Sequence, residues 1–423
     1  MSKERSFGGA VRVWGLAALV MAAACGGGAE DDTGAVSQSL TAVASFGSNP
    51  GRLSMYEYAP AGVPANAPLV VALHGCTQSA DAYVGAGWNQ LADTWKFYVV
   101  YPQQSSSNNS NKCFQWWDAA STARDSGEAL SIKQMVDSMK ARHSIDPSRV
   151  FVTGLSAGAA MTSVMLATYP DVFSAGAIMA GLPFRCASST SDAYTCMGGS
   201  VDKTPAQWGA LVRGATKVTA APPRVSIWQG TGDYTVRPAN ATELVDQWTD
   251  VNGVDTTADL TETVKGATHT VYQDGSGGAR VERWLIPNMG HGTAIEPGLA
   301  AAAGCGTAGA YILSAGICST YYAGLFFGLG TPPAASDAGT PDARSTVDAG
   351  APSDAGRDAA GFACKTWNAT VYAHVVAGRA VRCGLANSYA CAVGSGEQIG
   401  LWNLLPGTLR ETRAGYYEVG ACP

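Results

Sequence analysis

The sequence predicts an α/β fold with a central, mostly parallel sheet, followed by a small disulfide-rich, β-rich module. Over residues 42–330, short uninterrupted apolar runs, which suit parallel strands buried on both faces, alternate with helical patterns. A segment rich in Pro, Ala, Asp and Gly over 331–361 then predicts a disordered linker. Residues 362–423 hold four cysteines in a piece too small for a large core, so we expect disulfides to stabilise it.

The first 25 residues have the pattern of an export signal. Three basic residues precede the apolar run 13–24, which is too short to span a bilayer stably. The small residues before Cys25 suit a signal-peptidase site, but they also resemble a bacterial lipoprotein box, so lipid attachment at Cys25 stays open. Residues 26–41 are typical of a flexible tether, and we expect no transmembrane span. A net charge of −6 provides no basic surface for nucleic acid.

The elements before residue 145 suit this fold class. They are a strand over 52–58 near a sheet edge, a buried strand over 69–73, a helix over 82–96, a buried strand over 97–102 and a helix over 127–143. Between the last two, a polar loop leads to Trp116 and Trp117. Aromatic side chains beside a cleft can bind substrate, and the alternative is that both belong to the core. We expect at least one of the two to line a substrate cleft.

The stretch 149–161 organises the rest of the chain. An apolar strand leads into Gly154-Leu155-Ser156-Ala157-Gly158, a G-x-S-x-G frame, and then into a helix rich in Ala and Met. With 51 glycines in 423 residues, chance alone gives such a frame about 0.4 times, so the strand and helix around it carry the interpretation. So sharp a turn strains the central residue, and a Cβ at either glycine would collide with a neighbouring element. This context predicts the nucleophile elbow of an α/β-hydrolase, with Ser156 as nucleophile.

Two later loops supply an acid and a base. Further strands are expected over 175–181 and 225–228, and a strand–turn–strand hairpin over 268–286. Asp233 follows the strand 225–228, where this fold places its triad carboxylate, and the alternative is an aspartate of an ordinary turn. His291 lies between glycines in the loop after the hairpin. Ser156, Asp233 and His291 therefore occur in the order nucleophile, acid, base.

The loop after strand 69–73 is expected to complete the site. The backbone N–H groups of Cys76 and Ala157 are the predicted oxyanion-hole donors. We expect the other four histidines to have other roles. His74 shapes the oxyanion loop, His143 lies at the surface, and His269 and His374 are structural.

The cysteines predict disulfides rather than a metal site. Of eleven cysteines, ten remain when Cys25 is set aside, and an even number in an exported protein argues for pairing. The predicted pairs are Cys76–Cys113, Cys186–Cys196 and Cys305–Cys318. The C-terminal four, Cys364, Cys383, Cys391 and Cys422, allow three pairings that the sequence does not distinguish. No C-x-x-C, paired Cys/His spacing or H-E-x-x-H motif indicates a metal.

As an ordered set, six segments resemble the extracellular polyhydroxybutyrate depolymerases and their relatives, the feruloyl and acetylxylan esterases. The segments are 73–78, 113–117, 146–158, 169–173, 233–236 and 290–292. The resemblance covers about residues 45–330 and implies the triad Ser156, Asp233, His291 and an oxyanion donor at Cys76. It departs at Gln229-Gly230, where relatives often have His-Gly, a position that we expect not to touch the triad. The tail resembles a small module attached to some of these depolymerases, and both polymer binding and mere extension of the fold are open for it.

Together, the residues and the resemblance predict an exported serine carboxylic-ester hydrolase that depolymerises polyhydroxybutyrate without a metal or organic cofactor. It would be secreted, possibly with a lipid anchor, and its partner would be a polymeric ester. The closest rival is a feruloyl or acetylxylan esterase, and a rival of another class is a non-catalytic surface-binding lipoprotein. Activity should fall as the pH drops below about 7, because His291 must be neutral to accept a proton.

Overall fold

The computed structural model describes residues 39–298 and 303–330 and, further along, 364–370, 380–383, 389–392, 395, 398–401, 406–413, 416–420 and 422. The predicted signal segment with Cys25, nearly all of the tether, the predicted linker and His374 lie outside the described residues. In the part that is described, no helix is both long and apolar enough to cross a membrane.

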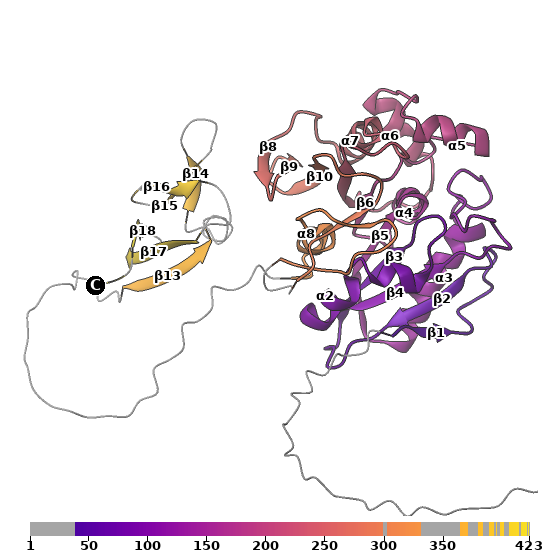
Figure 1. Ribbon diagram of the computed structural model, residues 1–423, viewed down its shortest axis with the longest axis horizontal. Coiled ribbons are helices and arrows are strands. Elements are labelled where there is room, and N and C mark those ends of the chain that lie inside the picture. Colours follow the sequence, from indigo (N-terminus) through magenta and orange to yellow (C-terminus); the bar gives the residue numbers. More distant parts are fainter. Residues whose placement is uncertain are drawn as a thin grey trace, which may run out of the picture. The chain divides into compact units, whose positions relative to one another are not determined.

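A ten-stranded sheet runs through the larger part of the chain, in the order β1-β2-β4-β3-β5-β6-β7-β10-β9-β8 (Figure 1). Its strands are β1 (Thr41–Val43), β2 (Ser54–Tyr58), β3 (Ala67–Leu73), β4 (Tyr98–Gln103), β5 (Ile145–Leu155), β6 (Ala175–Met179), β7 (Arg224–Gly230), β8 (Leu260–Val264), β9 (Ala267–Gln273) and β10 (Ala279–Ile286). From β4 to β10 all neighbours are parallel. Both margins are antiparallel. The predicted, mostly parallel sheet is confirmed.

Helices cover both faces of this sheet. They are α1 (Ala80–Val84), α2 (Trp88–Trp95), α3 (Gly127–Arg142), α4 (Ala157–Thr168), α5 (Thr190–Met197), α6 (Pro205–Arg213), α7 (Ala239–Asn252) and α8 (Ser319–Phe327). Successive side chains of a strand point to opposite faces, and those of β3 do so. Leu69, Val71 and Leu73 join a core with α3 and α4, whereas Val70 and Ala72 join one with α1, α2 and α8. The prediction that this strand is buried on both faces is confirmed.

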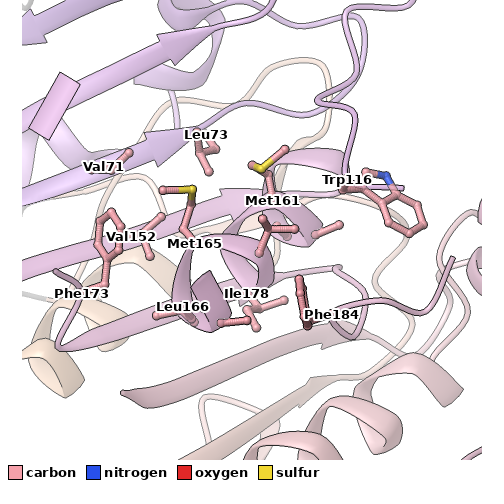
Figure 2. Close-up of a cluster of buried hydrophobic side chains, with 14 of the residues drawn as sticks. Val71, Leu73, Trp116, Val152, Met161, Met165, Leu166, Phe173, Ile178 and Phe184 are labelled. Carbon is pink, nitrogen blue, oxygen red and sulfur yellow. The ribbon is translucent and has the colours of Figure 1, made fainter. Parts of the chain in front are cut away.

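Helix α4 is held against the sheet along its whole length. All twelve of its residues are buried, and Figure 2 shows Met161 and Met165 in one cluster with Val71, Leu73 and Val152 of the strands. Burying a side chain of this size contributes roughly 1.5–3 kcal/mol. The helix that begins immediately after Ser156 is therefore a rigid support for it.

The predicted helix over 82–96 is wrong as a single element, because the chain forms α1 and α2 with a break between them. Gly87 in the break has φ of 94°, in the left-handed region that favours glycine. A Cβ on Gly87 would meet Cys305 and the backbone of Gly306. The chain turns here so that the distant segment around Cys305 can pack closely, a demand that the local pattern does not reveal.

Two smaller sheets are described after residue 364. One has the order β13-β17-β18 and the other β14-β15-β16, which confirms a β-rich C-terminal module. Their strands are β13 (Lys365–Thr370), β14 (Ala380–Cys383), β15 (Tyr389–Ala392), β16 (Gln398–Leu401), β17 (Pro406–Arg413) and β18 (Tyr416–Val419). A disulfide joins Cys364 to Cys422, which is compatible with only one of the three possible pairings. The three pairs predicted for the larger part of the chain are also present.

Candidate active site

Ser156 lies at the turn between β5 and α4, with φ of 57° and ψ of −118°. A serine at this positive φ is strained, so the surrounding packing must hold it there. A Cβ on Gly154 would meet the backbone of Gly158, and a Cβ on Gly158 would meet the carbonyl oxygens of Leu73 and His74. Glycine is therefore needed at both positions, because β5, α4 and the end of β3 approach one another so closely.

Asp233 and His291, from two different loops, meet side chain to side chain. The Nδ1 atom of His291 lies 2.7 Å from Oδ2 of Asp233. The other carboxylate oxygen, Oδ1, accepts hydrogen bonds from the backbone N–H groups of Thr235 and Val236 at 2.8 and 2.9 Å. A proton on Nδ1 leaves Nε2 of His291 as the nitrogen that can accept another. Among the residues that the structure describes, Nε2 has no hydrogen-bond partner.

Ser156 and His291 line the same cavity, which has a volume of about 510 Å³. Cys76 and Ala157 line it as well. Ala157 is the first residue of α4, and the first N–H groups of a helix have no intrahelical acceptor. Within the described parts of the chain, neither the N–H of Cys76 nor that of Ala157 has an acceptor. Both groups are therefore available to a negative charge that develops near Ser156.

Trp116 and Trp117 form one wall of the cavity. Their rings meet edge to face, with centroids 5.5 Å apart. Trp116 is only 5% exposed and also belongs to the core shared with α3 and α4, whereas Trp117 is partly buried. The two alternatives considered for the sequence thus combine in Trp116, which packs in the core and still faces the cavity.

Glu128 binds the segment just before Trp116, and the sequence analysis did not predict this role. It lies in the first turn of α3 and is 1% exposed. Its carboxylate accepts hydrogen bonds from the Gln115 backbone N–H at 2.8 Å and from Nε2 of Gln104 at 2.5 Å. Burial raises the pKa of Glu128 to about 7, although these hydrogen bonds oppose the shift. A glutamate in the first turn of a helix normally faces solvent, so the sequence contains no signal for this role.

His74 is enclosed rather than open to the cavity. Its Nδ1 lies 2.7 Å from the carbonyl oxygen of Gly75, and its Nε2 accepts the backbone N–H of Gln104 at 3.1 Å. Burial lowers the pKa of His74 to about 4, so the ring is neutral and both nitrogens are engaged. The prediction that His74 shapes the loop after β3 by hydrogen bonds is confirmed.

The other two described histidines pair with carboxylates away from the cavity. His269 is held between Glu262 at 2.9 Å and Glu282 at 3.0 Å. Burial disfavours its charge, but the two carboxylates outweigh this and raise the pKa of His269 to about 9. Its predicted structural role is confirmed. His143, predicted at the surface, is partly buried instead, because its ring stacks on Tyr98 and its Nε2 lies 3.3 Å from Oε2 of Glu57.

Gln229 contradicts the expectation that its position does not touch the triad residues. Its Nε2 lies 3.2 Å from Oδ2 of Asp233. Gln229 is in β7 and Asp233 in the loop that follows. The position at the end of that strand, four residues before the acid, was the available signal.

Ser156 lies at a strained strand-to-helix turn and shares a cavity with a carboxylate-bound histidine. This arrangement places the protein among the α/β-hydrolases. Residues 53–269 match the family model described as esterase PHB depolymerase, and the chain belongs to that family. It is thus a carboxylic-ester hydrolase, and the rival interpretation as a non-catalytic lipoprotein is not supported.

Individual relatives carry two kinds of name. The chain is 59% identical over 291 residues to poly(3-hydroxyalkanoate) depolymerase C of Paucimonas lemoignei, which covers 69% of this chain and 70% of that protein. It is 37% identical over 263 residues to feruloyl esterase B of Talaromyces stipitatus, covering 60% of this chain and 72% of the other. An acetyl xylan esterase from Aspergillus awamori is a similar solved structure, with a TM-score of 0.56 and 31% identity. The match covers 60% of this chain and 94% of that structure's chain.

Proposed function

We propose that this protein hydrolyses the ester bonds of a poly(3-hydroxyalkanoate), with Ser156 as nucleophile, His291 as general base and Asp233 as the acid that orients His291. The observation that carries the proposal is the shared cavity, which Ser156 and the Asp233-bound His291 both line. The similarity to poly(3-hydroxyalkanoate) depolymerase C supports the substrate class.

The reaction follows from these positions. Nε2 of His291 takes the hydroxyl proton as Oγ of Ser156 attacks the ester carbonyl. The N–H groups of Cys76 and Ala157 stabilise the resulting oxyanion, each typically by ~3 kcal/mol. Collapse of this intermediate breaks the ester C–O bond, and the imidazolium gives its proton to the departing alcohol end of the chain. Water, activated by the same imidazole, then cleaves the acyl-Ser156 ester and releases the acid.

The character of the cavity supports a neutral polyester. Apart from His291, none of its described lining side chains is a charged residue. Three exposed tyrosines lie in or beside the cavity: Tyr194 is 69%, Tyr234 79% and Tyr311 44% exposed. Tyr194 and Tyr311 line the cavity, and Tyr234 lies beside the lining residue Thr235. A surface of this kind suits a substrate chain longer than the cavity.

A feruloyl or acetylxylan ester is the second candidate, since the same triad serves it. The observation that favours it is the polar side of the cavity, formed by Asn109, Ser110 and Asn111. Such side chains can donate hydrogen bonds to sugar hydroxyls.

We also propose that the protein acts outside the cytoplasm. Four disulfides among the described residues fit an oxidising compartment. The basic and apolar N-terminal segment fits export. Labelling cells with a radioactive fatty acid, with Cys25→Ser as control, tests the lipid anchor; label lost in the variant supports it, and absence of label from both indicates free secretion.

Wild type and Ser156→Ala, each assayed on a p-nitrophenyl ester, a polyhydroxybutyrate suspension and feruloylated arabinoxylan, test the proposal. We expect wild type to clear the suspension and Ser156→Ala to lose at least ~10⁴-fold on every substrate. Ser276→Ala, in the turn between β9 and β10, is the control and should behave as wild type. Ferulate release without clearing would favour the second candidate, and full activity of Ser156→Ala would exclude the mechanism.

A further inference from the structure

Gln229 makes a concentrated set of contacts behind the acid loop. It is 1% exposed and does not line the cavity. Its Nε2 donates toward the carbonyl oxygens of Gly230 and Val236, at 3.2 and 3.0 Å, as well as toward Oδ2 of Asp233. All three neighbours are acceptors. The amide nitrogen, rather than its oxygen, must therefore face them.

Two side chains therefore share one oxygen of Asp233. Oδ2 receives Nδ1 of His291 at 2.7 Å and Nε2 of Gln229 at 3.2 Å. The backbone N–H groups of Thr235 and Val236 take the other oxygen. A donor on Oδ2 partly offsets the negative charge there, so it weakens the attraction of the carboxylate for the imidazolium of His291.

The bridging contacts also fix the direction of the carboxylate. Gly230 and Val236 stand at either end of the turn that carries Asp233, and one amide group ties both carbonyl groups together. Asp233, with no exposed side-chain surface, is thus held from the strand behind it as well as from its own loop.

Few other charged or titratable groups act on this carboxylate. His291 is in direct contact with it, and Tyr311 packs edge-on against the His291 ring at a centroid distance of 6.0 Å. Arg237, on the same loop, lies over the exposed ring of Tyr234 at 5.0 Å. An amide does not titrate, so the influence of Gln229 on Asp233 is constant across the working pH range.

We propose that Gln229 is a positioning residue of the catalytic site, which aims Oδ2 of Asp233 at His291 and moderates the hold of the carboxylate on the imidazolium. The inference rests on the proposed function, because it assigns Gln229 a part in the same proton transfer. Gln229 acts through Asp233 and does not touch the substrate.

Gln229→Met tests this, because methionine has a similar length and no donor. We expect kcat for a soluble ester to fall about tenfold, because a carboxylate that is no longer aimed at His291 orients the imidazole less well for proton transfer. KM should stay unchanged, since the residue does not line the cavity. The acidic limb of the pH–rate profile should move about half a unit toward higher pH, because the imidazolium is held more tightly.

Gln247→Met is the matched control. Gln247 is also a fully buried glutamine whose amide bridges two backbone carbonyl groups, those of Phe184 and Trp208. Gln247→Met should lose about as much thermal stability as Gln229→Met, but the acidic limb of its pH–rate profile should not shift. If Gln229→Met does not fold, Gln229→Asn, which keeps the amide but is too short to reach Asp233, replaces it. The NMR resonance of the His291 Nδ1 proton, followed with pH, reports the same shift without catalysis.

If the acidic limb of the pH–rate profile of Gln229→Met does not move, the proposal is overturned, whether kcat stays at the wild-type level or KM rises. An equal shift in Gln247→Met would overturn it too. Failure of the proposed function itself is distinct, because it would appear as wild-type activity in Ser156→Ala, whatever the Gln229 variants do.

Discussion

His269 and His291 are each bound by carboxylates, and they differ in whether a ring nitrogen is left free. His291 gives one nitrogen to Asp233, and the other has no partner among the described residues of the site. His269 gives both nitrogens to carboxylates and stacks on Trp284 with centroids 3.8 Å apart. One carboxylate leaves a histidine able to take a proton, whereas two carboxylates fix it as a cation. In this molecule that cation joins β8, β9 and β10.

The sharpest test of this comparison is to remove each imidazole in turn. His291→Ala should lower kcat by at least ~10⁴-fold, because His291 is the only histidine or carboxylate among the described residues that line the cavity with Ser156. His269→Ala should keep kcat near wild type. It should lose roughly 3–5 kcal/mol of unfolding free energy, because the cation that pairs with buried Glu282 and with Glu262 is removed. Ester hydrolysis and urea denaturation measure the two effects, and a folded His269→Ala variant without activity would contradict the comparison.

The carboxylates give the second test. Asp233→Asn should lower kcat about 10⁴-fold, because an amide can turn its NH₂ group toward His291 and favour the wrong tautomer. Glu282→Gln makes the same chemical change beside His269 and should leave kcat unaltered. A loss of activity in Glu282→Gln at unchanged thermal stability would show that the two clusters are coupled.

The charge of His269 predicts a pH dependence of stability. Its pKa is raised from 6.5 to about 9 in the folded protein. The stabilisation is therefore complete below pH 6.5 and is lost as the pH rises through about 9. The full effect is at most about 3 kcal/mol. Urea midpoints from pH 6 to 10 measure it.

The control for this series is His269→Gln, which should flatten the curve between pH 6.5 and 9. Burial raises the pKa of the Glu128 carboxyl from 4.5 to about 7, so this group also lowers stability as the pH rises, but in that lower pH range. Its effect is the same in wild type and in His269→Gln, because both proteins contain Glu128. A wild-type curve that superposes on that of His269→Gln would mean that His269 is not a cation.

How much the sequence could predict depends on the range of the signal. Ser156, Asp233 and His291 each follow a strand with its own local pattern, so their loops could be located before the structure was known. The break at Gly87 depends on the distant segment around Cys305, which no local pattern reveals. For the contact between Gln229 and Asp233 the only sequence signal was their spacing of four residues at the end of β7. The role of Glu128 is similar, because burial reverses the usual meaning of a glutamate in a first helical turn.

The smallest expected effect concerns Tyr234, an exposed side chain near His291 that has no counterpart among the described residues beside His269. Tyr234, beside Asp233, is 79% exposed. If the polymer binds over the cavity that His291 lines, and not near His269, Tyr234 should contact it. Tyr234→Ser should then slow clearing of a polyhydroxybutyrate suspension by about fivefold, because roughly 1 kcal/mol of apolar contact is lost. Hydrolysis of a soluble ester should not change. Val218→Ser is the control, because Val218 is also exposed but lies before β7, at the opposite end of the strands from the acid loop. An equal loss on the soluble ester would assign Tyr234 to the acid loop rather than to polymer contact.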